Sequence, residues 1–422
     1  MSSSTPPAPA WIISCLQWLN PRRIRAQAIV LALCLWGVCA VDFATPGMFD
    51  RAGNVKFQDF LPFYISARFI SEHRANDLYD QKAQANELQS IVRQSSRVVI
   101  PNLYGPQVGL FFVPLAALSF SVASGIWSAL SALVYFACIY AIWKRCPALA
   151  LHAKIVALAA VAFPPLFHVF VRGQISALVL ACFTVAFLAF QSGRGWLAGL
   201  ALGFLVFKPQ FLVAIPLILL LAGAWKPFVM LVLSAFGQLA LTRIYFGASV
   251  MRSYLEMFLH PSRWIGAAEL SLAPIQMHSL RSFWSLLIPS PNSAFVLYAL
   301  TSVVVIAIAT VAWRSQSSPA LRFSALVLAA ILVNPHLFVY DLLVLAPVLL
   351  IATDWALTNG AHRFAPQLKL LLYLAFVLPL FGPLSRWTHL QLSVLVFAAI
   401  LWTLRRTGTP GHKLASTESR VV

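Results

Sequence analysis

The sequence contains a succession of apolar runs that are long enough to cross a lipid bilayer. The first covers 19 residues, from Ala26 to Ala44, and it directly follows the basic segment Pro21–Arg25. A membrane-spanning α-helix needs about 20 such residues. A β-barrel would show short alternating segments instead, so these runs predict an all-α, polytopic helical membrane protein.

Composition excludes the main soluble classes. Of the 422 residues, 60% are hydrophobic and 10% are charged, whereas soluble domains are about 25% charged. A soluble enzyme, a coiled coil and a disordered chain are thereby excluded. In a membrane protein, the net charge of +18 reflects an excess of Lys and Arg in the cytoplasmic loops. We therefore expect membrane lipids as partners and no nucleic acid.

The basic flank of the first run places the N-terminus in the cytoplasm. A cleaved signal peptide is an alternative, because Val38-Cys39-Ala40 resembles a processing site. The region before that site would be unusually long for a signal peptide, which favours an uncleaved helix. We expect a cytoplasmic segment over 1–25, a transmembrane domain over 26–404 and a basic cytoplasmic tail over 405–422. The protein should be integral to the inner membrane of a bacterium.

Residues 45–105 form the longest polar stretch of the chain. They follow a helix that runs from inside to outside, so they should form the first extracytoplasmic loop. Leu61–His73 and Ala75–Val92 have helical spacing with mixed faces, which predicts short helices on the membrane surface. Gly105–Phe120 is apolar but short and contains two prolines, and we interpret it as interfacial or partly inserted.

The later apolar runs bring the expected total to about ten to twelve membrane helices. Trp196–Ala224 is interrupted by Lys208-Pro209, so it forms either a broken pair that dips in from the cytoplasm or two thin crossings. The other runs are Val122–Trp143, Lys154–Val171, Ile175–Gln191, Phe228–Phe246, Phe295–Trp313, Ala320–Val333, Val339–Asp354, Leu368–Leu384 and Leu390–Leu404.

The sequence offers few other chemical motifs. Its six cysteines lie in predicted helices or on the inside, so no disulfide framework or Cys-based metal site is expected. It has no Walker loop, no dinucleotide Gly fingerprint and no His pair at zinc spacing. Any energy source must therefore arrive as an activated substrate or an ion gradient.

Carboxylates are scarce and unevenly placed, which narrows the choice of catalytic groups. Seven of the twelve acids fall between residues 42 and 87. Among them Asp59 lies at the predicted start of an outer helix, flanked by Phe60 and Phe63. The structural interpretation is a helix cap. The functional one is a general base held at the boundary between membrane and water.

A lone acid in the first outer loop of a many-helix protein resembles the GT-C glycosyltransferases, and the detailed pattern resembles glycosyltransferase family 87, a polyprenyl-phosphate-mannose-dependent mannosyltransferase-like group. The resemblance spans residues 57 to about 342. The matching elements are Asp59-Phe60 with Tyr64 and Ala67, Asp77-Leu78-Tyr79-Asp80, Tyr104-Gly105-Pro106 with Pro114, Gly173-Gln174, Ala198-Gly199, Lys208-Pro209-Gln210, Phe246-Gly247, Asn334-Pro335-His336 and Tyr340-Asp341-Leu342.

The resemblance implies a GT-C type bundle and an inverting transfer of a hexose, with mannose the first candidate. Asp59 would deprotonate a hydroxyl of a lipid or glycan acceptor at the periplasmic face, and a polyprenyl-phosphate sugar would be the donor. Many GT-C enzymes bind a divalent metal through paired acids in this loop. Here Gln58 and Phe60 flank Asp59, so no metal and no cofactor are predicted.

Cations and polar groups near the outer face are the candidates for holding the donor. The predicted set is His336, Lys208, Arg172, Gln174 and Arg281, with Tyr64, Asp77 and Tyr104 as acceptor or loop residues. For each Arg the alternative is snorkelling at a helix end. A Lys at bilayer depth costs about 2.5–3.5 kcal/mol, so Lys208 needs a partner, a lipid phosphate, a water-filled cavity or a polar turn.

Asp341 is an acid inside a hydrophobic run and leaves a second class of function open. It is either part of a proton- or ion-coupled pathway or the partner of His336 or of an Arg across the bundle. Together with Lys208-Pro209 it partly fits a secondary transporter or a flippase of sugar substrates. A polysaccharide polymerase or ligase is a third alternative, although such enzymes usually centre on a large late outer loop.

Overall fold

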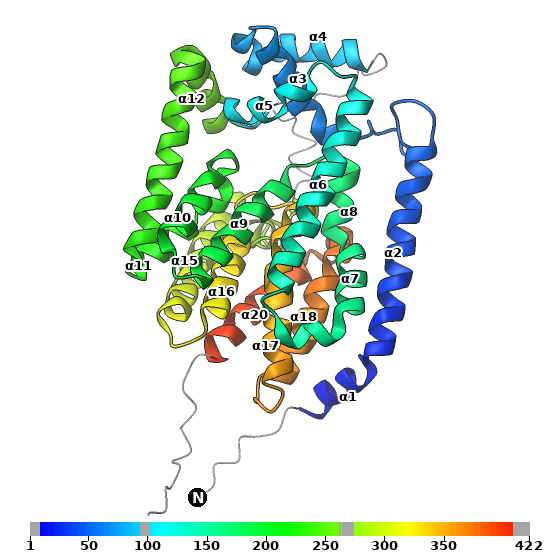
Figure 1. The fold of residues 1–422 in the computed structure, drawn as a ribbon, viewed down its shortest axis with the longest axis vertical. Helices are drawn as coiled ribbons and strands as arrows, with labels where there is room; N and C mark the ends of the chain where they lie inside the picture. Colours follow the sequence, from blue (N-terminus) through cyan, green and yellow to red (C-terminus); the bar gives the residue numbers. More distant parts are fainter. Residues whose placement is uncertain (1–8, 93–101, 261–262, 264–273, 408–422) are drawn as a thin grey trace, which may run out of the picture.

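The computed structural model describes residues 9–92, 102–260, 263 and 274–407, and these residues form a helical bundle with a cap at one end (Figure 1). The described residues contain no β-strand, only two isolated bridges. The predicted fold class, an all-α polytopic membrane protein, is confirmed.

Six helical segments of the described chain are long and apolar enough to cross a membrane, and a bent pair would make a seventh. The six are α2 (Pro21–Ala44), α6 (Phe120–Trp143), α12 (Trp225–Leu259), α15 (Pro291–Arg314), η8 with α17 (Val339–Thr358), and α18 with η9 and α19 (Ala365–Thr388). The bent pair joins η4 and α7 (Pro147–Val161) to α8 (Pro164–Arg172) at an angle of 40°. The predicted single run over 154–171 is therefore broken, because Pro164 and Pro165 begin a new helix.

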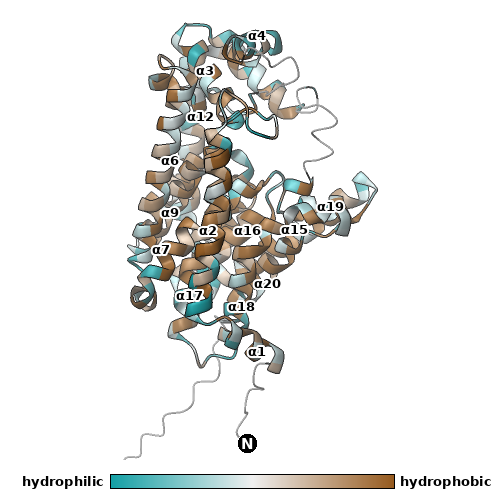
Figure 2. Ribbon diagram, turned by 90° about the vertical axis from the view of Figure 1, so that its right-hand side faces the viewer, coloured by the Kyte–Doolittle hydropathy of each residue, from teal (hydrophilic) through white to brown (hydrophobic). Residues whose placement is uncertain are grey.

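Shorter apolar helices accompany these six. In the bundle they are α9 (Ser176–Gln191), α16 (Pro319–Leu332) and the two arms of the segment around Lys208, whereas α5 with η3 (Pro106–Leu115) packs against α3 of the cap (Figure 1). The last helix, α20 (Leu392–Thr407), packs against α16 and α18. Figure 2 shows that hydrophobic residues dominate the helices of the bundle. Several of its leucines, such as Leu33, Leu133 and Leu241, are exposed. A lipid environment accounts for such exposure.

The cap is built from the first loop, as the helical spacing predicted. It contains η1 (Gln58–Phe60), α3 (Leu61–Ser71), η2 (Ala75–Tyr79) and α4 (Gln81–Ile91), and Asp80 caps α4 by accepting from the backbone N–H groups of Lys82 and Ala83. Helix α1 (Ala10–Trp18) and the end of α20 lie at the opposite end of the bundle from this cap (Figure 1). The long helix α2 connects the two ends.

The segment around Lys208 is a helical hairpin with two short arms. One arm is α10 (Gly195–Gly203) with η5 (Phe204–Phe207), and the other is η6 (Pro209–Leu212) with α11 (Ile215–Leu221). Gly195 lies against Pro227 near the start of α12, so the chain returns to the end from which it entered. This geometry favours the broken pair over two crossings, and it places Lys208 at the turn between the arms.

Glycines allow α10 to pack tightly on α12. Gly199 and Gly203, four residues apart, face the α12 backbone, where a Cβ at either position would collide with the carbonyl oxygens of Pro227 and Leu231 respectively. A Cβ at Gly203 would also lie 2.6 Å from that of Ser234. Small residues at this spacing are the usual means by which membrane helices approach closely.

We expect Gly203→Ala to destabilise the protein by about 1–3 kcal/mol, because the added methyl group forces α10 away from α12. Gly237→Ala is the matched control, since Gly237 lies within α12 and a Cβ there meets nothing within 4 Å. Thermal unfolding of both purified variants in detergent measures the difference. Equal melting temperatures would show that α10 and α12 do not depend on this contact.

Candidate active site

Asp59 lies where the cap meets the membrane bundle. It belongs to the single turn η1, which leads directly into α3. The preceding residue Phe57 has a left-handed backbone (φ 54°), and this conformation costs a bulky residue roughly 1–3 kcal/mol. The strained turn directs the chain from the loop into the helix, and the Asp59 side chain remains 17% exposed.

The last residue of α8 and a residue of the turn that follows it hold the Asp59 carboxylate. The amide Nε2 of Gln174 donates to Oδ2 at 2.8 Å, and Nη1 of Arg172 lies 3.6 Å from Oδ1. An ionised carboxylate can only accept, so the NH₂ of Gln174 must face it. The amide oxygen of Gln174 then accepts from the Tyr104 hydroxyl at 3.2 Å. Asp59, Gln174 and Tyr104 therefore form one hydrogen-bonded chain.

Tyr104 is held in its neutral form. Burial raises the pKa of the phenol well above its ordinary value, and the carboxylates of Asp341 and Asp59 raise it further. The hydroxyl therefore remains a donor to Gln174 at any physiological pH. The ring packs edge-on against Phe63 of α3, with 4.8 Å between ring centres, which fixes its position.

Gly173 brings the turn against the cap. Its φ of +73° ends α8 in the left-handed region that favours glycine, and a Cβ there would lie 2.7 Å from the Cβ of Phe60. The indole Nε1 of Trp127 donates to the Gly173 carbonyl at 3.0 Å, and the Trp127 ring stacks on Phe60. The conformational freedom of this glycine and the close approach of the cap are both required for Gln174 to reach Asp59.

A second polar cluster lies just inside the bundle. Lys208 forms an ion pair with Oδ1 of Asp341, and Ser176 donates to the same oxygen at 2.7 Å. The side chains of Lys208 and Asp341 are 2% and 1% exposed. The Lys208 ammonium also lies 5.2 Å from the centre of the Tyr340 ring. The sequence offered His336 or an Arg as the partner of Asp341, whereas the structure pairs it with Lys208.

The Asp59 cluster and the Asp341 cluster are close enough to act on the same side chains. The charges of Asp59 and Asp341 both act on Tyr104 and on Tyr340, and the charge of Arg172 also acts on Tyr340. Ser176 follows Gln174 by two residues, so the same turn supplies a ligand to each carboxylate. The other oxygen of Asp341, Oδ2, is buried without a hydrogen-bond partner among the described residues. Such an atom is rare and points to function or to strain.

His336 and Arg281 lie on neighbouring parts of the structure. The His336 side chain is exposed, packs edge-on against Phe338 and lies within electrostatic reach of Asp341 and Lys208. Arg281, in α14 (Leu280–Leu287), lies over the rings of Phe295 and Tyr298. The Tyr298 hydroxyl donates to the carbonyl of Val333, so Arg281 flanks the Asn334–His336 loop.

Tyr64 and Asp77 have structural contacts elsewhere in the cap. The Tyr64 hydroxyl donates to the Leu118 carbonyl at 2.6 Å, which attaches α3 to the start of α6. Asp77 accepts from Arg74 at 2.9 Å, within an exposed ion-pair network that also includes Glu72. These contacts keep both side chains in the cap framework.

Sequence reasoning did not single out Ser176 or Trp127. Ser176 carries no pattern of its own, and only its position two residues after Gln174 could have drawn attention to it. Trp127 lies within an ordinary apolar run. Their roles depend on contacts with residues that are distant in the chain, Asp341 and Gly173.

The model of glycosyltransferase family 87 matches residues 102–339, more than half of the chain. The chain belongs to this family. Tyr104, Arg172, Gln174, Lys208, Arg281 and His336 lie within the matched region, and Asp59 lies before it. No curated protein and no solved structure matches the chain. The protein is therefore a membrane glycosyltransferase by family.

The donor atoms around Asp59 do not resemble a metal site. Its neighbours are an amide and a guanidinium, and the part of the chain that the structure describes contains no group of three or more His, Cys, Asp or Glu side chains that could hold a metal ion. The positive charge beside the carboxylate comes from Arg172.

We expect Lys208→Met to destabilise this glycosyltransferase by about 3–5 kcal/mol, because it leaves the Asp341 carboxylate buried and unpaired. Asp341→Leu should also lower the stability, because it leaves the Lys208 ammonium buried and unpaired. The double variant should recover most of the loss, since an apolar pair of similar volume replaces the ion pair. Thermal unfolding of the wild type, the two single variants and the double variant measures the coupling free energy between the two side chains. Additive losses would contradict a direct pair.

Proposed function

We propose that the protein transfers a hexose, with mannose the first candidate, from a polyprenyl-phosphate sugar to a lipid or glycan acceptor. The observation that carries this proposal is the Asp59 carboxylate at the junction of cap and bundle, held by Gln174 and Arg172. The family supplies the reaction class. A general base at such a junction can meet a water-borne acceptor and a lipid-borne donor.

The proposed step is a single displacement. Asp59 accepts the proton of an acceptor hydroxyl as the oxygen attacks the anomeric carbon of the donor sugar. The bond from that carbon to the phosphate oxygen breaks, and polyprenyl phosphate leaves with the electron pair. The attack comes from the face opposite the leaving group, so the configuration of the sugar inverts. Because the phosphate is a good leaving group, one carboxylate suffices.

Arg172 is the proposed ligand of the donor phosphate. It is 34% exposed, and its contact with Asp59 is long at 3.6 Å, which leaves guanidinium N–H groups available. His336, which lies within electrostatic reach of Lys208 and Asp341, and Arg281 are proposed as additional donors to the phosphate or sugar. With a guanidinium already beside the base, we infer that transfer needs no resident metal and no cofactor.

The remaining predicted residues receive positioning roles. We assign to Gln174 and Tyr104 the orientation of the base, since they form one hydrogen-bonded chain with it. Lys208 is engaged by Asp341, and we assign to this pair the support of the turn through Ser176. Tyr64 and Asp77 are proposed to stabilise the cap on which the acceptor binds.

The proposed location is the inner membrane of a bacterium, with both termini in the cytoplasm and Asp59 facing the periplasm. Support comes from the basic residues at the α1 end, Arg22, Arg23 and Arg25, and from the position of the cap at the opposite end (Figure 1).

The alternative of a sugar transporter rested on Lys208 and Asp341. Their charges pair with each other, and the family match favours transfer over transport. A transferase should release polyprenyl phosphate as sugar is joined, and a transporter should show ion-dependent uptake.

We expect Asp59→Asn to reduce transfer by about 10²–10⁴-fold, the contribution typical of a general base, because the amide cannot accept the proton. The isosteric change should leave the melting temperature almost unchanged. A purified-protein assay with polyprenyl-phosphate mannose and a glycan acceptor measures the rate. Asp80→Asn is the matched control, because an Asn at this position can still cap α4. Full activity of Asp59→Asn would exclude Asp59 as the base.

We expect Arg172→Gln to raise the KM for the lipid-phosphate donor by about 10- to 100-fold, which corresponds to the loss of a hydrogen bond to a charged group. Arg172→Lys should recover part of the affinity through its charge. Steady-state kinetics with varied donor measure the effect. If Arg172 only orients Asp59, kcat should fall while the KM for the donor stays constant.

A further inference from the structure

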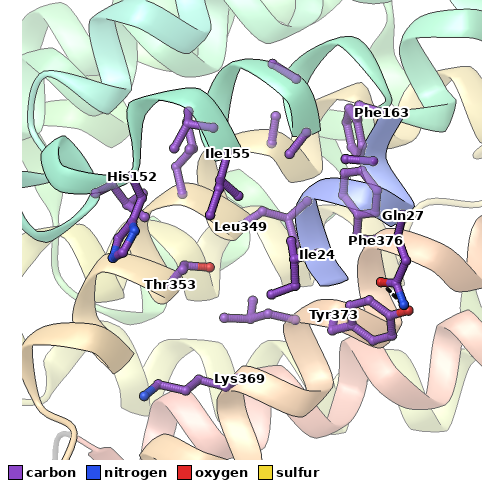
Figure 3. A pocket seen from close by; sticks show the side chains of 18 of the residues that line it. Ile24, Gln27, His152, Ile155, Phe163, Leu349, Thr353, Lys369, Tyr373 and Phe376 are labelled. Carbon is purple, nitrogen blue, oxygen red and sulfur yellow. Dashed lines mark hydrogen bonds between the residues drawn. The ribbon is translucent and has the colours of Figure 1, made fainter. Parts of the chain in front are cut away.

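A large apolar cavity lies at the end of the bundle opposite to Asp59. Its volume is about 510 Å³, within the range typical of sites for small lipophilic ligands. The walls come from the end of α1, the first half of α2, the middle of α6, η4 and α7, α17 and α18 (Figure 3). These segments span residues 16 to 377, so the cavity exists only in the assembled bundle.

Helix α2 stands against the bundle at few points. Only Ala28 and Cys39 of its residues are buried. The Tyr373 hydroxyl donates to Gln27 at 3.2 Å, and the indole of Trp36 donates to the Val161 carbonyl at 2.9 Å. The Tyr373 to Gln27 bond lies at the edge of the cavity, which is partly open to the surface. Inside a bilayer, a partly open apolar space of this size fills with hydrocarbon rather than with water.

The polar groups of the cavity point to an anionic headgroup. Lys369 and His152 lie toward one edge and the Gln27–Tyr373 pair toward the other (Figure 3). Lys369 is half-buried, and within the described ranges neither Lys369 nor His152 has an ion-pair or hydrogen-bond partner. An unpaired ammonium at the edge of an apolar cavity is complementary to a lipid phosphate.

The surrounding charge is strongly positive. Arg22, Arg23 and Arg25 begin α2, next to the lining residue Ile24. The acid at this end of the described chain is Asp354, and its carboxylate already accepts from the backbone N–H groups of Ala148 and Leu149, at 2.7 and 3.2 Å. The field at the edge of the cavity therefore attracts an anion and repels a cation.

We propose that this cavity binds one anionic phospholipid of the leaflet at the α1 end. One acyl chain fills the space between α2, α7 and α18, and the phosphate meets the Lys369 ammonium at the edge. The lipid packs the loosely held α2 onto the bundle. This site is separate from the proposed catalytic centre and does not depend on the reaction assigned to Asp59.

The test is lipid retention by the purified full-length protein. The protein is reconstituted in nanodiscs of equal phosphatidylglycerol and phosphatidylcholine, extracted into detergent, and examined by native mass spectrometry. Wild type should retain one phosphatidylglycerol. Ala159→Phe, which fills the cavity, should lose it, and Ala157→Phe, on the exposed face of the same helix, should keep it.

Lys369→Gln tests the headgroup without disturbing the packing. It should reduce the preference for phosphatidylglycerol over phosphatidylcholine by about fivefold, whereas Lys154→Gln, an exposed base outside the cavity, should not. If Ala159→Phe fails to fold, the lipid preference of Lys369→Gln still tests the proposal, because a half-buried side chain can be replaced without unfolding the protein. The proposal is overturned if wild type retains no lipid, if it retains both lipids equally, if Ala159→Phe retains as much as wild type, or if Lys369→Gln has no effect.

Discussion

The close approach of Gly173 to Phe60 is the contact on which the proposed site depends. It joins two parts of the chain with different surroundings, an outer cap and a membrane bundle, and it leaves no room for a side chain at residue 173. The indole of Trp127 donates a hydrogen bond to the carbonyl of this glycine, which holds the turn in place. From this point Gln174 reaches outward to Asp59 and Ser176 reaches inward to Asp341. One turn thus positions both carboxylates.

Much of the fold follows from the sequence because the bilayer restricts the choices. Apolar runs in a membrane protein can only be helices, and the polar stretch after α2 can only lie outside the hydrocarbon. Details that depend on the packing of one helix against another could not be predicted from the sequence. Hydropathy ends one run at Phe246, whereas α12 continues past the kink at Gly247 to Leu259, and in this last part Tyr254 packs against Tyr79 of the cap. The return of the chain at Lys208 depends on glycine contacts with α12, which no local pattern reveals.

The candidate site was predictable as a set of residues but not as an arrangement. Asp59, Arg172, Gln174 and Tyr104 each stood out by charge, scarcity or resemblance. Their contacts join positions 115 and 70 residues apart, which a single sequence does not encode in any local signal. Lys208 and Asp341 each needed a partner on energetic grounds, and they supply it to one another. The cavity beside α2 was also invisible, since its walls come from five separate regions of apolar sequence.

The central claim is that Asp59 activates an acceptor for direct displacement of the lipid phosphate. The most direct measurement is the anomeric configuration of the newly formed linkage, determined by NMR on the product of purified enzyme and a donor of defined configuration. A single displacement predicts that the linkage has the configuration opposite to that of the donor. A product that retains the donor configuration would contradict the account, because it would require a covalent intermediate or attack from the same face.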